Sequence, residues 1–304
     1  MKRSIKAVIL GFAALGLLST LGCVCYSCRA NRVLEGEIES AKRDGATGII
    51  SGSEPITLPA AGQNACLLVH GWIGSRVDFN DLGSALNDRG FTVRLMLLPG
   101  HATTPRALEG ISAEEMLEAV RVEYRALRTR YERVDVVGFS MGGTLATLLA
   151  AEEAIDRLVL VAPFYEVTHK WFYILTAETW NNIFSPFVPY AIKTESNKKV
   201  NRVDARPHIF SYKTFPTEAV TLLCDLGHRA ADEALLSRIE CPVLLVYSPG
   251  DEAASPEAAQ RAQGAMKSKK KEAFPCPRSN HHILWDYDGP EAIEAICDFL
   301  IVDR

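Results

Sequence analysis

The chain has 304 residues, of which 48% are apolar and 23% charged, a composition typical of a folded globular protein with one large or two ordinary domains. The formal net charge of −4 excludes the strongly basic surface that nucleic-acid binding requires, so we expect no nucleic-acid partner. The sequence contains no internal repeat and no long low-complexity tract of the kind that marks repeat proteins or disordered chains.

The N-terminal segment has a pattern of its own. Lys2, Arg3 and Lys6 precede an uncharged and largely apolar stretch over residues 7–28. A basic start followed by an apolar run is typical of an export signal, and the run is about long enough to span a bilayer. We therefore predict that residues 1–30 form a signal or membrane anchor that holds the protein at the exported face of a bacterial cell membrane.

Three cysteines, Cys23, Cys25 and Cys28, lie at the end of that stretch. The small residue before Cys23 resembles the lipobox of bacterial lipoproteins, whereas Thr20 stands where that motif usually has leucine. A cleaved lipoprotein signal and a retained anchor acylated on one of these cysteines therefore both stay open. The five other cysteines show no CxxC motif and no Cys/His ligand spacing, so we expect neither a metal site nor a disulfide framework.

The rest of the chain divides into a spacer and one domain. Residues 31–54 are polar with mixed charges and predict the spacer, and residues 55–304 alternate apolar runs with helical periodicity. The expected strands cover residues 65–71, 91–100, 133–140, 155–163, 241–251 and 270–276. The expected helices cover residues 79–90, 113–131, 141–153 and 289–301. Strands that alternate with helices need crossover connections, so this order predicts an α/β fold with a mostly parallel sheet flanked by helices.

The alternation stops over residues 164–237, which predicts a cap inserted over one end of the sheet. The first part of this segment is rich in aromatic residues, namely Phe164, Tyr165, Trp171, Phe172, Tyr173, Trp180, Phe184, Phe187 and Tyr190. These side chains form either the core of the cap itself or an apolar pocket that meets a lipid-like substrate, and both interpretations stay open.

A serine stands between glycines where the third predicted strand meets the helix behind it. The pentapeptide "GFSMG", with Ser140 at its centre, fits the motif G-x-S-x-G in its expected context of strand before and helix after. A serine on such a turn projects its hydroxyl above the strand ends, next to the free N–H groups of a helix N-terminus. Ser140 is therefore the predicted nucleophile, and the backbone N–H groups of Met141 and Trp72 are the predicted oxyanion hole.

A base and an acid for this serine follow later in the chain. Asp251 comes directly after an apolar strand, and His281 and His282 follow the next one. A serine hydroxyl needs a neutral imidazole to take its proton, and a carboxylate on the other ring nitrogen fixes the tautomer of that imidazole. The residues by themselves leave open which of the two histidines acts.

The motifs "LLVHGW", "LPGHATTP", "GFSMGG" and "SNHHI" together resemble the α/β-hydrolase family, and within it the carboxylesterase and monoacylglycerol-lipase-like branch. The resemblance covers roughly residues 65–300 and implies the α/β-hydrolase fold with a variable cap and no cofactor. It also implies a triad of Ser140, Asp251 and His281. His281 is favoured because the catalytic histidine of this family usually follows a serine and one small or polar residue. One departure is the pair Tyr247-Ser248, which stands where relatives often have His-Gly.

These observations predict a serine hydrolase that cleaves carboxylic esters of apolar acyl chains, such as monoacylglycerols, through an acyl-enzyme. An acyltransferase or a thioesterase with the same triad is the alternative, because the fold does not determine which nucleophile resolves the acyl-enzyme. A non-catalytic binding protein on a hydrolase fold would have an incomplete triad, and this sequence contains all three residue types in the family order. The expected partners are a small-molecule or lipid ester and, through the N-terminal segment, a membrane.

Overall fold

The computed structural model describes residues 2–168, 174–194 and 198–301, and for residues 2–19 it describes the helical backbone alone. Its main sheet consists of β1 (Ile56–Leu58), β2 (Asn64–Val69), β3 (Thr92–Leu95), β4 (Arg133–Phe139), β5 (Leu158–Val161), β8 (Val243–Tyr247) and β9 (Lys271–Pro275). The strand order is β1-β3-β2-β4-β5-β8-β9. All neighbours are parallel except β1, which pairs with β3 in antiparallel fashion. The predicted mostly parallel sheet is thus confirmed, and the short antiparallel edge strand β1 is an addition that the sequence did not indicate.

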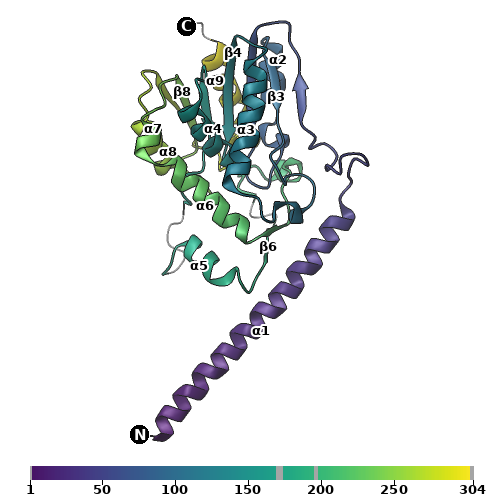
Figure 1. The fold of residues 1–304 in the computed structure, drawn as a ribbon, viewed down its shortest axis with the longest axis vertical. Helices are drawn as coiled ribbons and strands as arrows, with labels where there is room; N and C mark the ends of the chain where they lie inside the picture. The colour runs from purple at the N-terminus through teal and green to yellow at the C-terminus, as the bar shows by residue number, and fades with distance from the viewer. Residues whose placement is uncertain (1, 169–173, 195–197, 302–304) are drawn as a thin grey trace.

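Helices cover both faces of this sheet (Figure 1). They are α2 (Leu82–Asp88), α3 (Ala113–Arg128), α4 (Met141–Glu152), α8 (Pro256–Ala265) and α9 (Gly289–Ile301). Side chains of α2 and α9 share one buried cluster with one face of the strands, and side chains of α3, α4 and α8 share another with the opposite face. The side chains of the inner strands β2, β4, β5 and β8 are therefore covered whichever way they point, which explains the continuous apolar runs in the sequence, whereas the edge strands β1 and β9 stay partly or largely exposed.

The centre of the molecule is the pair formed by β4 and α4. All but the first residue of β4 are buried, and the residues from Met141 to Ala150 of α4 are buried as well. A helix that is apolar on every side needs a fully enclosed position, and α4 has one because α3, β2, β5 and α6 surround it. The turn between β4 and α4 is consequently held between two elements that are almost entirely buried.

The segment between β5 and β8 forms the cap. Its elements are α5 (Ala177–Phe184), β6 (Tyr190–Ile192), β7 (Thr214–Pro216), α6 (Glu218–Ala230) and α7 (Glu233–Leu236). β6 and β7 pair in antiparallel fashion as a separate two-stranded sheet. Three of the predicted cap aromatics, Trp171, Phe172 and Tyr173, lie outside the described residues.

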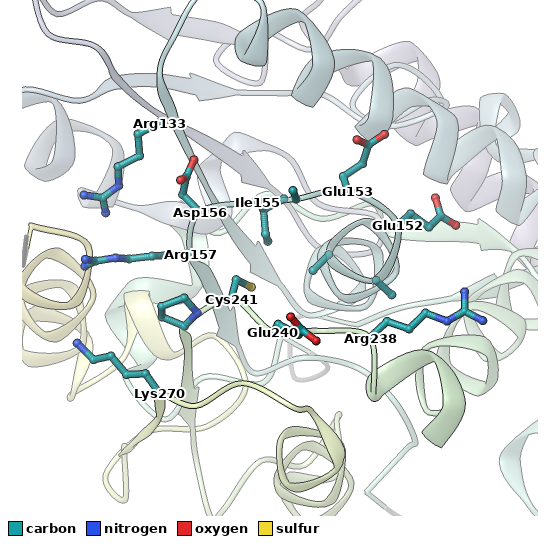
Figure 2. Close-up of a pocket in the computed structure, with 14 residues that line it drawn as sticks. Arg133, Glu152, Glu153, Ile155, Asp156, Arg157, Arg238, Glu240, Cys241 and Lys270 are labelled. Atoms are coloured by element: carbon teal, nitrogen blue, oxygen red, sulfur yellow. The ribbon is translucent and has the colours of Figure 1, made fainter. Parts of the chain in front are cut away.

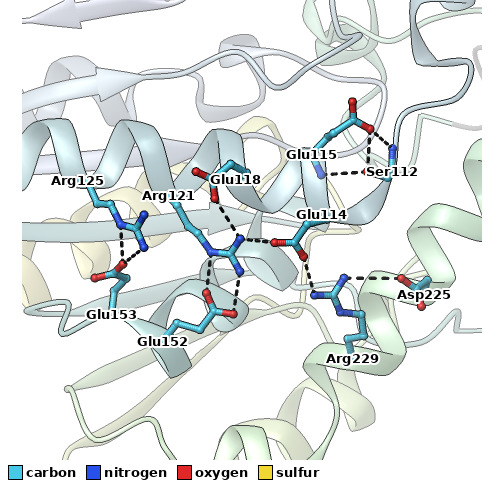
Figure 3. Close-up of polar contacts among 10 residues, drawn as sticks. All are labelled: Ser112, Glu114, Glu115, Glu118, Arg121, Arg125, Glu152, Glu153, Asp225 and Arg229. Carbon is cyan, nitrogen blue, oxygen red and sulfur yellow. Dashed lines mark hydrogen bonds and ion pairs between the residues drawn. The ribbon is translucent and has the colours of Figure 1, made fainter.

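Ion pairs connect the cap helix α6 to the core helices (Figure 3). The Arg121 guanidinium on α3 binds both carboxylate oxygens of Glu152 on α4, at 2.7 and 3.0 Å, and also pairs with Glu114. Glu114 in turn lies 3.4 Å from Arg229 on α6. The ion pairs therefore run from Glu152 on α4 through Arg121 and Glu114 on α3 to Arg229 on α6.

The N-terminal helix α1 spans Lys2–Ser40 and extends away from the body of the molecule (Figure 1). It continues without a break through residue 30, the predicted boundary between anchor and spacer, because Ala30 and Leu34 are buried against Tyr190 of the cap. Among the residues whose side chains are described, no helix is long and apolar enough to cross a membrane. Residues 1–19 of the predicted anchor lie outside that set.

Candidate active site

The turn between β4 and α4 holds Ser140 in a backbone conformation that residues other than glycine rarely adopt, with φ 53° and ψ −119°. Neighbouring glycines make this turn possible. A Cβ on Gly138 would lie 2.3 Å from the carbonyl oxygen of Gly142, and a Cβ on Gly142 would lie 1.8 Å from the carbonyl oxygen of Val69 on β2. The glycines of the motif are therefore required by close backbone contact, and the strained serine is presented at the N-terminus of α4.

Ser140, His281 and Asp251 form a continuous chain of hydrogen bonds. The His281 Nε2 atom lies 2.9 Å from Ser140 Oγ, and the His281 Nδ1 atom lies 2.7 Å from Asp251 Oδ2. All three side chains are buried. The other carboxylate oxygen, Asp251 Oδ1, accepts the backbone N–H groups of Ala253 and Ala254 at 2.7 and 2.9 Å. This arrangement is able to deprotonate a serine hydroxyl during attack on a carbonyl carbon.

The parallel sheet explains why three distant residues meet. Ser140 follows β4, Asp251 follows β8 and His281 follows β9, so all three lie beyond the carboxyl ends of parallel strands, which share one edge of the sheet. The departure at Tyr247-Ser248 does not displace the aspartate. Ser248 instead fastens the loop, because its hydroxyl donates to the carbonyl oxygen of Ser279 at 2.5 Å.

His282 occupies a different environment from His281. Its ring packs 5.2 Å from the ring of Phe139, and its buried Nδ1 atom has no hydrogen-bond partner among the described residues. Burial and the neighbouring His281 hold the pKa of His282 well below its usual range. His282 is therefore a neutral wall residue, and the structure brings Ser140 and Asp251 together at His281.

The predicted oxyanion-hole residues, Trp72 and Met141, adjoin Ser140 from two sides. Met141 begins α4, and Trp72 lies on the loop after β2, where a Cβ on Gly71 would be 3.2 Å from Ser140 Cβ. Neither backbone N–H donates to an acceptor within the described part of the chain. His70 anchors this loop, since its Nε2 atom accepts the Leu98 N–H at 3.0 Å. Burial lowers the pKa of His70 to about 3, so the ring stays neutral and able to accept.

Asp78 is the second support of the same loop. Its Oδ2 atom accepts the backbone N–H of Gly71 at 3.0 Å, and a Cβ on Gly74 would lie only 2.3 Å from that oxygen. The side chain is almost fully buried, and its Oδ1 atom has no hydrogen-bond partner among the described residues. Burial raises the pKa of Asp78 to about 7. Nothing in the sequence pattern singled out this carboxyl, because its role depends on how the loop folds back.

A cavity of about 270 Å³ opens above Ser140. Its apolar wall consists of Trp72, Phe139, Phe164, Val167, Phe210, Phe215 and Leu223. The polar part of the lining includes Asp78, Lys193, Lys199 and Ser211. Of the nine aromatics in the first part of the cap segment, Phe164 is the one described residue in this wall, whereas Phe210 and Phe215 come from further along the cap. Tyr165 belongs to the core instead, where its hydroxyl lies 2.8 Å from that of Thr147.

A larger cavity of about 730 Å³ lies at the amino ends of the strands, the opposite end of the sheet from Ser140. Figure 2 shows the basic side chains of Arg133, Arg157 and Lys270 along one side of it. Cys241 also lines this cavity, but burial raises the pKa of its thiol to about 12, so no thiolate forms at neutral pH. Its described lining contains no histidine to act as a base. The smaller cavity at Ser140 is therefore the candidate active site.

Comparison with known proteins places the chain in a family and agrees with its fold. Residues 61–288 match the family model described as serine aminopeptidase, S33. The chain is 30% identical over 251 residues to a thermostable monoacylglycerol lipase of Bacillus sp. (strain H-257), a match that covers 83% of this chain and 95% of that protein. It is 32% identical over 106 residues to a carboxylesterase of Bacillus subtilis (strain 168), covering 34% and 43%. The crystal structure of a monoacylglycerol lipase of Paleococcus ferrophilus superposes with a TM-score of 0.70 at 21% identity and covers 81% of this chain and 97% of its own.

Substitution of Gly142 by alanine tests the close contact between α4 and β2. Because the added methyl group would overlap the carbonyl oxygen of Val69, we expect the free energy of unfolding to fall by about 3 kcal/mol or more. Denaturant titration followed by circular dichroism measures this loss. Gly264→Ala is the matched control, since Gly264 lies within α8 with no atom near its Cβ position, and we expect it to be neutral or stabilising. Equal stabilities of the two variants would contradict the steric account.

Proposed function

The chain belongs to the serine aminopeptidase S33 family of α/β hydrolases, and on that premise we propose that it is a carboxylic ester hydrolase with Ser140 as its nucleophile. The observation that carries the proposal is the hydrogen-bonded chain from Ser140 through His281 to Asp251 at the floor of an apolar cavity. The names of the relatives, a monoacylglycerol lipase and a carboxylesterase, support an ester as the substrate.

In the proposed reaction the hydroxyl of Ser140 attacks the ester carbonyl while His281 Nε2 takes its proton. Asp251 holds the imidazole in the correct tautomer and stabilises the imidazolium that forms. The N–H groups of Trp72 and Met141 donate to the oxyanion of the tetrahedral intermediate. His281 then returns the proton to the leaving alcohol, and a water molecule activated by the same ring hydrolyses the acyl-enzyme.

The charges of the cavity favour an ester over the peptide that the family description suggests. An aminopeptidase must bind the substrate's terminal ammonium group, which calls for a carboxylate in the site. Here the charged side chains that line the cavity include two lysines: Lys193 donates to the Ser211 hydroxyl at 2.8 Å, and Lys199 is paired with Glu252 at 2.9 Å. Neither lysine attracts an ammonium group. The one carboxyl among the cavity's described lining residues, Asp78, has a pKa of about 7 and is only partly charged at neutral pH. An uncharged ester meets none of these electrostatic costs.

The wall of the cavity favours an apolar acyl chain. Phe164, Phe210, Phe215 and Leu223 line the space above Ser140 together with Trp72, whose ring contacts that of Phe215. Burial of a hydrocarbon chain against aromatic and aliphatic side chains stabilises the complex by about 0.8 kcal/mol for each methylene group removed from water. We therefore assign medium-length acyl esters, such as monoacylglycerols, as the preferred substrates.

Hydrolysis of p-nitrophenyl esters with acyl chains from two to sixteen carbons tests this assignment. We expect kcat/KM to rise with chain length to an optimum and then to fall, because the cavity is finite. Ser140→Ala should abolish turnover at every length. The wild-type chain should not release p-nitroaniline from amino-acid p-nitroanilides. If the wild type labels with a fluorophosphonate yet turns over no ester, the acyl-enzyme must be resolved by another acceptor, and an acyltransferase would replace the hydrolase.

The two adjacent histidines provide a second test. Because His281 alone contacts Ser140 and Asp251, we expect His281→Ala to lower kcat by about 10⁶-fold. His282→Gln changes a wall residue and should lower kcat less than about tenfold. Steady-state kinetics on the optimal p-nitrophenyl ester, with melting temperatures as the check on folding, separates the two. A larger loss at position 282 than at 281 would reverse the assignment.

We also propose that residues 1–30 tether the enzyme to a membrane, which the basic start and the apolar run of the sequence support. In bacterial cells the full chain should sediment with membranes and resist a high-salt wash. A chain without residues 1–19 keeps every contact between α1 and the cap described above, and it should move to the supernatant with an unchanged melting temperature. Equal partition of both forms would contradict the tether.

A further inference from the structure

The C-terminal half of α1 is packed against the cap along one stripe. Tyr26, Ala30, Leu34 and Glu37 recur every three or four residues, which places them on one side of the helix. The hydroxyl of Tyr26 accepts the backbone N–H of Ile192 at 3.0 Å. Ala30 and Leu34 are fully buried and cluster with the ring of Tyr190. The stripe therefore contacts both ends of β6, at Tyr190 and at Ile192, and it ends at Glu37, beside β7.

Glu37 is bonded to β7 by both of its carboxylate oxygens. Oε1 accepts the backbone N–H of Lys213 at 2.7 Å. Oε2 accepts the backbone N–H of Thr214 at 3.0 Å and the hydroxyl of Thr214 at 2.8 Å. Hydrogen bonds to an ionised acceptor are stronger than neutral ones, and Thr214 is completely buried. One side chain of α1 thus satisfies two adjacent backbone donors at the start of a cap strand.

The next residue of β7 lies in the active-site wall. Successive side chains of a strand point to opposite faces, so Thr214 faces α1 while Phe215 faces the cavity. The ring of Phe215 lies 4.7 Å from the ring of Trp72, in an edge-to-face arrangement. The carbonyl oxygen of Lys213 also accepts the N–H of Lys193 at 2.7 Å, and Lys193 is another cavity residue.

We propose that Glu37 is a positioning residue for the substrate cavity: by clamping Lys213 and Thr214, it sets the position of Phe215 against Trp72 and so defines the wall that receives the acyl chain. The inference rests on the proposed function for the identity of the ligand, an acyl chain, and on the hydrogen bonds and ring contacts for the coupling. It makes the end of α1 part of the enzyme's specificity rather than a connection between an anchor and a domain.

Hydrogen exchange tests the clamp without any need for turnover. In the full-length Glu37→Ala variant, the amides of Lys213 and Thr214 lose their acceptors and should exchange at least about tenfold faster than in the wild type. Glu37→Gln keeps one carbonyl oxygen and should give an intermediate rate, which also serves if the alanine variant folds poorly. Glu39→Ala is the matched control, because Glu39 is an exposed glutamate two residues further on the same helix. Unchanged exchange at both amides in Glu37→Ala would overturn the proposal.

Reaction of Ser140 with ethyl and decyl fluorophosphonates tests the consequence for the cavity. We expect Glu37→Ala to lower the labelling rate of the decyl reagent about tenfold and that of the ethyl reagent less than twofold. In the same variant, KM should rise for long p-nitrophenyl esters and change little for short ones. Equal loss for both reagents, or none for either, would overturn the positioning role even if exchange is faster. A wild type that labels with both reagents yet hydrolyses no ester would refute the proposed function alone, because labelling and exchange still report on Glu37.

Discussion

The backbone of Ser140, at φ 53°, is the constraint on which the active site depends. A side chain in this conformation is strained, and the fold compensates by packing α4 so closely on β2 that position 142 has no room for a Cβ. The strain points the hydroxyl away from the core and toward the edge where parallel strands end. Asp251 follows β8 and His281 follows β9, so the parallel sheet places both residues at the same edge as Ser140.

The histidines near this edge of the sheet fall into two groups, those that burial keeps neutral and the one that faces a carboxylate. Desolvation lowers the pKa of His70 to about 3, and it keeps His282 neutral as well. Neutral rings can brace loops without placing positive charge beside an imidazolium. His281 differs because its Nδ1 atom faces the carboxylate of Asp251, which would stabilise the charge that the ring takes up in the proposed reaction.

The cavity above Ser140 is assembled from segments that are far apart in the chain. Trp72 comes from the loop after β2, Phe164 from the start of the cap segment that follows β5, and Phe215 from β7 in the cap. α1 adds a further layer, because Glu37 holds the strand that carries Phe215. The helix that begins with the apolar N-terminal stretch therefore also contacts the cap strand whose Phe215 lines the cavity.

The residue pattern alone predicts the mostly parallel sheet, the strand-to-helix turn at Ser140 and the chain order of Ser140, Asp251 and His281. These features depend on local periodicity and on backbone limits that glycine alone can meet, so a short stretch of residues carries each signal. The folded structure was needed to show which aromatics line the cavity, that Asp78 holds Gly71 in the loop that carries Trp72, and that α1 continues past residue 30. Each of these outcomes depends on a contact between two segments far apart along the chain. The residue spacing within one segment does not indicate which other segment it will contact.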